Sequence, residues 1–101
     1  MPRSKSELRR RALALAEKVF TSLARFCESG DSALECYERH SRLRLKQLAH
    51  ILSTLDRLVT ERDMRFLRTL PRGIEAEAEE ELRRRVALRV AELRARSSLK
   101  S

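Results

Sequence analysis

The sequence predicts an all-α protein, and two observations support this prediction. The apolar residues are mostly Leu and Ala, which favour helix, and the chain contains no tryptophan. The stretch from Ser32 to Leu70 contains neither glycine nor proline. Its apolar side chains recur every three or four positions, at Leu45, Leu48, Leu52, Leu55 and Val59. This spacing is typical of helices that pack against helices, so we expect one unbroken helix over 32–70, on the order of 55 Å long.

A first helix is expected over residues 5–28. Ser4 followed by Glu7 is a capping-box pattern, which favours a helix start at this point. Apolar side chains then form a single stripe, at Leu8, Ala12, Leu15, Val19 and Phe26. Gly30 suits the position that follows a helix end. Because the connection is short, the first two helices should form a long antiparallel hairpin.

A C-terminal helix is expected over residues 74–96, after a break at Pro71 and Gly73. Its first turns are rich in Glu and its later turns in Arg, an order that suits the helix dipole. The whole chain, 1–101, is then a single helical domain, with residues 1–4 and 97–101 as flexible ends.

The second helix of this hairpin is longer than the first, which can cover it only as far as about residue 55. The uncovered part keeps an apolar stripe, at Leu55, Val59, Phe66, Leu67 and Leu70. Such a stripe needs either the C-terminal helix or another subunit, because burying an apolar side chain of this size is worth about 1.5–3 kcal/mol. The stripe therefore predicts a homo-oligomer.

No residue pattern predicts catalysis, a cofactor or a metal site. His40 and His50 are ten residues apart and match no zinc pattern, and the chain has too few glycines for a phosphate-binding loop. Cys27 and Cys36 flank the predicted hairpin turn, where we expect reduced, dispensable packing residues. We see no signal peptide or membrane span, and expect a non-enzymatic protein of the bacterial cytoplasm.

The charge points to a polyanionic partner. The chain has 23 basic and 15 acidic residues, a formal net charge of +8, and most of the basic residues are Arg. Two segments are the candidate DNA-binding sites: Arg39, Arg42, Arg44 and Lys46 in the second helix, and Arg9, Arg10 and Arg11 in the first. Such residues could contact DNA phosphates without reading sequence. The alternatives are a solvated face balanced by Glu35 and Glu38, and an Arg excess that reflects genome composition.

The stretch from Leu13 to Asp63, which includes ALALAEKVFTSLARFCESGD and ERHSRLRLKQLAHILSTLDRLVTERD, resembles the small terminase subunits of tailed phages and of alphaproteobacterial gene transfer agents. In that family an antiparallel hairpin assembles into rings and presents DNA to the packaging motor. The resemblance implies an oligomeric DNA-packaging accessory protein, with double-stranded DNA and a large terminase ATPase as partners. The chain has no room for the N-terminal helix-turn-helix domain of many small terminases, so DNA binding should be largely non-specific.

Two other functions fit the same composition. One is a helical adaptor that binds proteins and not DNA, such as an anti-sigma-like factor or a secretion chaperone. The other is a small phage or plasmid transcriptional regulator, which would bind a specific operator far more tightly than random DNA.

Overall fold

The fold consists of five helices in a computed structural model that describes residues 4–30 and 32–100, with the backbone alone for 99 and 100. The helices are α1 (Lys5–Cys27), α2 (Ala33–His40), α3 (Leu45–Leu55), α4 (Glu61–Thr69) and α5 (Arg72–Lys100). No strand occurs among the described residues, so the all-α prediction is confirmed.

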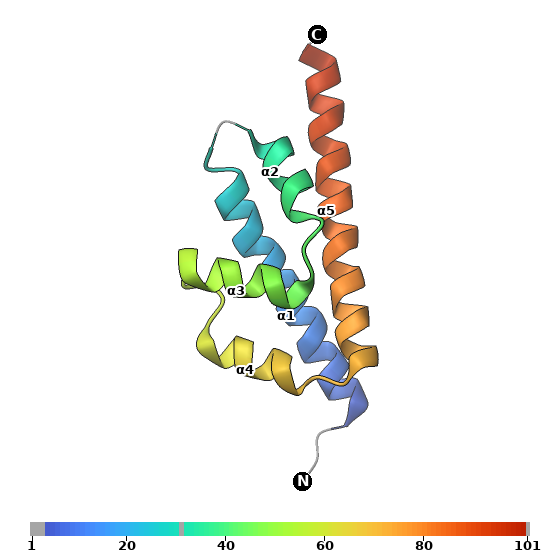
Figure 1. The fold of residues 1–101 in the computed structure, drawn as a ribbon. Coiled ribbons are helices and arrows are strands. Elements are labelled where there is room, and N and C mark those ends of the chain that lie inside the picture. Colours follow the sequence, from blue (N-terminus) through green and yellow to red (C-terminus); the bar gives the residue numbers. More distant parts are fainter. Residues whose placement is uncertain (1–3, 31, 101) are drawn as a thin grey trace.

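The two long helices, α1 and α5, lie side by side and run in the same direction (Figure 1). Ion pairs between them show this register, because residue numbers rise together on both helices. The pairs are Arg9 with Glu77, Glu17 with Arg85, and Glu28 with Arg89. The shorter α2 and α3 contact both α1 and α5, and α4 packs below α3 (Figure 1).

One hydrophobic core connects all five helices. The α1 stripe predicted from the sequence supplies Ala12, Leu15 and Val19, which are at most 5% exposed. Tyr37 of α2, Leu48 of α3, Leu67 of α4 and Leu82 of α5 belong to the same core. The molecule measures 57 × 24 × 17 Å, and its length follows from α5.

The predicted ends of the outer helices are close to the observed ones. The Ser4 hydroxyl accepts a hydrogen bond from the backbone N–H of Glu7 at 3.2 Å, which confirms Ser4 as the cap of α1. The C-terminal helix starts at Arg72 and continues to Lys100, beyond the expected end at 96, and the expected flexibility of its last residues stays a prediction. The expected flexibility of residues 1–3 and 101 concerns positions outside the described residues.

The prediction of one unbroken helix over 32–70 is wrong, because polar side chains end helices here without glycine or proline. At the first break, Ser41 donates to the carbonyl oxygen of Glu38 at 2.8 Å. At the second break, Asp56 accepts from the backbone N–H of Leu58 at 2.9 Å. Such bonds offer the backbone an alternative to helical pairing. The stretch therefore folds into α2, α3 and α4 and turns back on itself.

Because the chain folds back, most residues of the predicted oligomer interface are buried. Val59, Leu67 and Leu70 are only 2%, 0% and 7% exposed, because this chain buries them in its own core. The prediction that this chain leaves them uncovered is wrong, because all three lie in its core. Whether they contact a second subunit stays a prediction. Phe66 is half-buried, and Leu55 alone of the five is largely exposed, at 58%. Self-association stays a prediction, but most of the apolar stripe that motivated it is buried by the chain itself.

Candidate nucleic-acid interface

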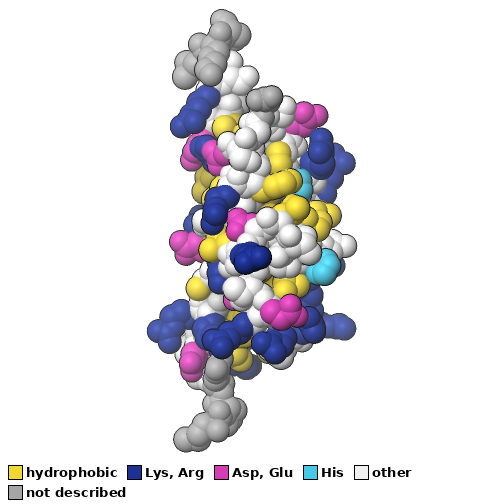
Figure 2. Space-filling model, turned by 90° about the vertical axis from the view of Figure 1, so that its left-hand side faces the viewer, with side chains coloured by type: hydrophobic (Ala, Val, Ile, Leu, Met, Phe, Trp, Pro, Cys, Tyr) yellow, Lys and Arg dark blue, Asp and Glu magenta, His cyan; other side chains and the backbone are white. Residues whose placement is uncertain are grey.

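Five exposed arginines lie on and beside α4. Their side chains make no ion pair within the described residues. We call this surface the α4 basic surface, and it consists of Arg57, Arg62, Arg65, Arg68 and Arg72. Figure 2 shows basic side chains gathered toward the lower end of the molecule, where α4 and the start of α1 lie.

The sequence of α4 dictates this arrangement. Thr60 caps the helix by accepting from the backbone N–H of Asp63 at 3.2 Å, and Asp63 accepts from the Thr60 N–H at 2.9 Å. Leu67 is buried in the core, and Asp63, Met64 and Phe66 of the preceding turn are half-buried. Arginines three residues apart, at Arg62, Arg65 and Arg68, therefore share the opposite, solvent-facing side of the helix.

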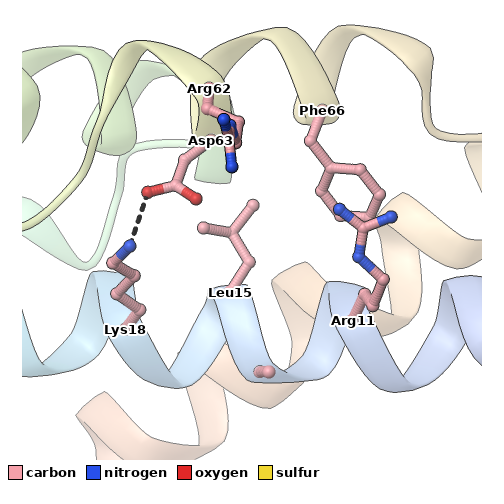
Figure 3. A pocket seen from close by; sticks show the side chains of 7 residues that line it. Arg11, Leu15, Lys18, Arg62, Asp63 and Phe66 are labelled. Atoms are coloured by element: carbon pink, nitrogen blue, oxygen red, sulfur yellow. Dashed lines mark hydrogen bonds and ion pairs between the residues drawn. The ribbon is translucent and has the colours of Figure 1, made fainter.

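A groove between α1 and α4 adjoins this surface (Figure 3). Its cavity of about 220 Å³ is lined by Arg11, Lys18 and Leu15 from α1, and by Arg62, Asp63 and Phe66 from α4. The Arg11 guanidinium lies over the Phe66 ring, 4.3 Å from its centre. Nη1 of Arg11 is buried and has no hydrogen-bond partner among the described residues. A buried N–H donor of this kind favours an acceptor.

Asp63 neutralises one of the cations of the groove. Lys18 Nζ donates to Asp63 Oδ2 at 2.8 Å. Burial by itself would raise the pKa of Asp63, but the hydrogen bonds from Lys18 and Thr60 outweigh it and lower the pKa below the ordinary 3.8. Asp63 is therefore ionised at neutral pH and balances Lys18. Arg11 and Arg62 remain without a carboxylate partner among the described residues, so the groove carries net positive charge.

The predicted DNA-binding residues fall into two groups. Three of them pair with acidic side chains of α5: Arg9 with Glu77 at 2.7 Å, Arg44 with Glu79 at 3.7 Å, and Lys46 with Glu75 at 3.4 Å. The other exposed ones, Arg10, Arg39 and Arg42, make no ion pair within residues 4–30 and 32–100.

The structure does not support one basic helix face made of Arg39, Arg42 and Lys46. Arg39 belongs to α2, Arg42 lies in the following turn, and Lys46 belongs to α3. Because α2 ends at His40, helical spacing no longer relates these three residues to one another. The prediction that they share one helix face is wrong, and their role in DNA binding stays a prediction; each is exposed.

Sequence reasoning missed the α4 basic surface. The three-residue spacing of its arginines is visible in the sequence. The apolar residues Phe66, Leu67 and Leu70 on the same predicted helix, however, indicated an oligomer interface and not a DNA-binding surface. The signal that could have found it was the Thr60–Asp63 capping box, which marks a separate short helix.

The two cysteines are also placed differently from the prediction. Cys27 and Cys36 form a disulfide between the end of α1 and α2, with their Cα atoms 5.4 Å apart. The turn between α1 and α2 brings the two helix ends together, and this Cα separation suits a disulfide. The expectation of reduced packing residues is therefore wrong for this structure.

Comparison of the chain with protein-family models, with curated proteins and with solved structures found no match. Among the described residues, no helix has a stretch both long and apolar enough to cross a membrane. The function of the protein is therefore inferred from the geometry and charge of the surfaces described above.

Proposed function

We propose that the protein binds the phosphate backbone of double-stranded DNA through the α4 basic surface, largely without regard to sequence. The observation that carries this proposal is the concentration of exposed arginines there without ion-pair partners in the described part of the chain. Elsewhere, Arg9, Arg83 and Arg94 each pair with a carboxylate of this chain.

The chemistry of these side chains suits phosphate. Arg presents a planar fork of donors that matches phosphate oxygens, and it stays charged at any physiological pH. The net charge of +8 favours approach to a polyanion. Phosphate contacts carry no base information, so random and selected sequences should bind alike.

A role in DNA packaging, with a ring-shaped homo-oligomer and a large terminase ATPase as partner, is a narrower proposal. It depends on the resemblance to small terminases, and that resemblance was carried by a stretch that folds as several helices. Binding of the duplex through α4 does not require it.

The test is a salt titration of binding to a fluorescent duplex of random sequence, followed by anisotropy. Wild type should bind in the non-specific range of about 10⁻⁴–10⁻⁶ M, with a log–log salt slope of about −0.9 per phosphate neutralised. Replacing Arg62, Arg65 and Arg68 by Gln should flatten this slope by about two to three units. The matched control replaces Arg39, Arg42 and Lys46 by Gln, which removes the same charge from the surface first predicted.

The two triple variants separate a local surface from bulk charge. If both flatten the slope equally, net charge and not α4 governs binding, and the proposed site is wrong. If wild type does not bind even at low salt, the protein is better described as a helical adaptor. A large preference for one sequence over random DNA would instead favour a transcriptional regulator.

A further inference from the structure

Three side chains with metal-binding atoms converge where α1 meets α2. Cys27, at the end of α1, is buried, while Cys36 and His40 of α2 are half-buried. One ligand atom from each lies within 4.8 Å of the others. Cys36 and His40 are four residues apart on α2 and so share one side of the helix. Two members of this group, Cys27 and Cys36, are the residues for which the sequence predicted only a packing role.

The surroundings hold the histidine in place. Nδ1 of His40 lies 2.8 Å from the carbonyl oxygen of Cys36 and 3.7 Å from the Cys36 sulfur. The Phe26 ring packs edge-on against the imidazole, with ring centres 5.5 Å apart. His40 is thereby held beside both sulfurs, which reduces the reorganisation that binding an ion would require.

The spacing suits tetrahedral zinc. Zn–S bonds of ~2.3 Å and Zn–N bonds of ~2.0–2.1 Å place neighbouring sulfur and nitrogen ligands ~3.6 Å apart. The observed 3.7 Å between Cys36 Sγ and His40 Nδ1 is close to this separation. Two sulfurs that are no longer bonded to each other repel to van der Waals distance, which opens room for an ion between them.

We propose that Cys27, Cys36 and His40 bind one Zn²⁺ ion when the cysteines are reduced. Two thiolates and a neutral imidazole form a soft donor set that zinc prefers over magnesium or calcium. Both thiols lose their protons to the solvent on binding, and the ion replaces the hydrogen bond between Nδ1 and the Cys36 carbonyl.

The fourth coordination position is left to water or an external ligand. The nearby carboxylate of Glu28 is already engaged, because it accepts from Tyr37 at 2.5 Å and pairs with Arg89. No further Cys, His, Asp or Glu joins the group within the described residues. The site is therefore open on one side, as catalytic rather than structural zinc sites are. This inference is independent of DNA binding.

Metal and disulfide are alternative states of the same two sulfurs. The disulfide excludes zinc, because neither sulfur is then a thiolate. A phosphine reductant converts the disulfide into two thiols while water supplies the oxygen of the phosphine oxide. Zinc binding should therefore appear only after reduction.

The test uses the full chain, reduced with a phosphine and desalted without oxygen, then titrated with Zn²⁺ against a chromophoric chelator. Reduced wild type should take up one zinc per chain, and oxidised wild type none. Co²⁺ in place of zinc should give the intense absorption of a tetrahedral thiolate complex. His40→Ala should weaken zinc binding at least tenfold, whereas His50→Ala, at an exposed position of α3, should leave it unchanged.

Folding of each variant is checked by circular dichroism, and His40→Ala leaves both cysteines intact. The proposal is overturned if the reduced wild type takes up no zinc at equimolar concentration. It is also overturned if His40→Ala binds zinc as tightly as wild type, because the cysteines would then bind without the predicted third ligand.

Discussion

Glu28 connects three helices through one carboxylate. It follows the last residue of α1, accepts a hydrogen bond from the buried Tyr37 hydroxyl of α2 at 2.5 Å, and pairs with Arg89 of α5. The bond from Arg89, and then that from Tyr37, lowers the pKa of Glu28 below its ordinary 4.5. Burial, and then the bond to Glu28, raises the pKa of Tyr37. The charged form of Glu28 is thus the one that the fold favours.

The lowered pKa of Glu28 predicts a loss of stability in acid. The folded state holds this proton less tightly than the unfolded state, so the stabilisation is present above about pH 4.5 and is lost as the pH falls through the folded pKa. Glu28→Gln should reduce the free energy of unfolding at pH 7 by about 1 kcal/mol, since a third of the side chain is exposed. At a pH below the folded-state pKa of Glu28 the variant should approach wild type.

Denaturant unfolding at several pH values, for wild type and Glu28→Gln, measures this difference. Glu35→Gln is the matched control, because Glu35 is exposed on α2 and makes no ion pair among the described residues. A Glu28→Gln variant whose loss of stability relative to wild type does not shrink at any pH below 4.5 would contradict the assigned role of the charge.

At the scale of elements, α4 depends on its cap and its packing. A helix of nine residues is too short to be stable alone in water. Its N-terminal bonds therefore matter more than those of α1 or α5. The Thr60 hydroxyl accepts from the Asp63 N–H, and Asp63 in turn binds Lys18 of α1. The cap thereby positions the ion pair beside the α1–α4 groove.

Removing the cap should be measurable as a loss of stability. Thr60→Ala is expected to cost about 1 kcal/mol, which corresponds to a fall in Tm of roughly 4–8 °C for a domain of this size. Thr21→Ala is the control, because Thr21 is exposed within α1 and its hydroxyl donates only to the Glu17 carbonyl. Thermal unfolding by circular dichroism compares the two. Equal melting temperatures would show that the cap contributes nothing to α4.

The helix ends show how far the sequence could predict the fold. The start of α1 was predictable because the Ser4 side chain caps it. Its end is capped at Glu28, and Gly30 does not adopt the positive φ of the predicted C′ position. The prediction for the middle of the chain was wrong because its helices end at Ser41 and Asp56. Serine and aspartate are also tolerated inside helices, so neither residue type marks a helix end by itself. Apolar periodicity continues through both breaks, because buried apolar residues lie both before and after each turn. Periodicity alone could not reveal them.

The candidate sites were predictable to different degrees. That an exposed Arg surface exists followed from the net charge, but its location on α4 depended on the tertiary turn at 56–60. Arg44 and Lys46 were exposed as expected, yet their pairing with Glu79 and Glu75 required knowing that α5 packs beside α3. The convergence of Cys27 on Cys36 and His40 likewise depends on how α1 and α2 meet.

At the scale of the whole molecule, the chain closes its own core. α5 spans the length of the molecule beside α1, and the three short helices fold over this pair (Figure 1). Val59, which an oligomer was expected to bury, is instead buried by its own chain, while Leu55 is exposed. The fold therefore does not need a second subunit to bury Val59, and self-association becomes a separate question from stability.

Two variants separate these questions. Val59→Glu places an unpaired charge in the core and should cost more than about 3 kcal/mol, enough to abolish a cooperative melting transition in a marginal domain. Leu55→Glu, at a position 58% exposed, should leave Tm within a few degrees of wild type. Where sedimentation shows a monomer, wild-type Tm should not change with protein concentration, because a single chain closes the core. Calorimetry over a hundredfold concentration range and sedimentation velocity test both points. A Tm that rises with concentration, together with a folded monomeric Val59→Glu, would return Val59 to an interface between subunits.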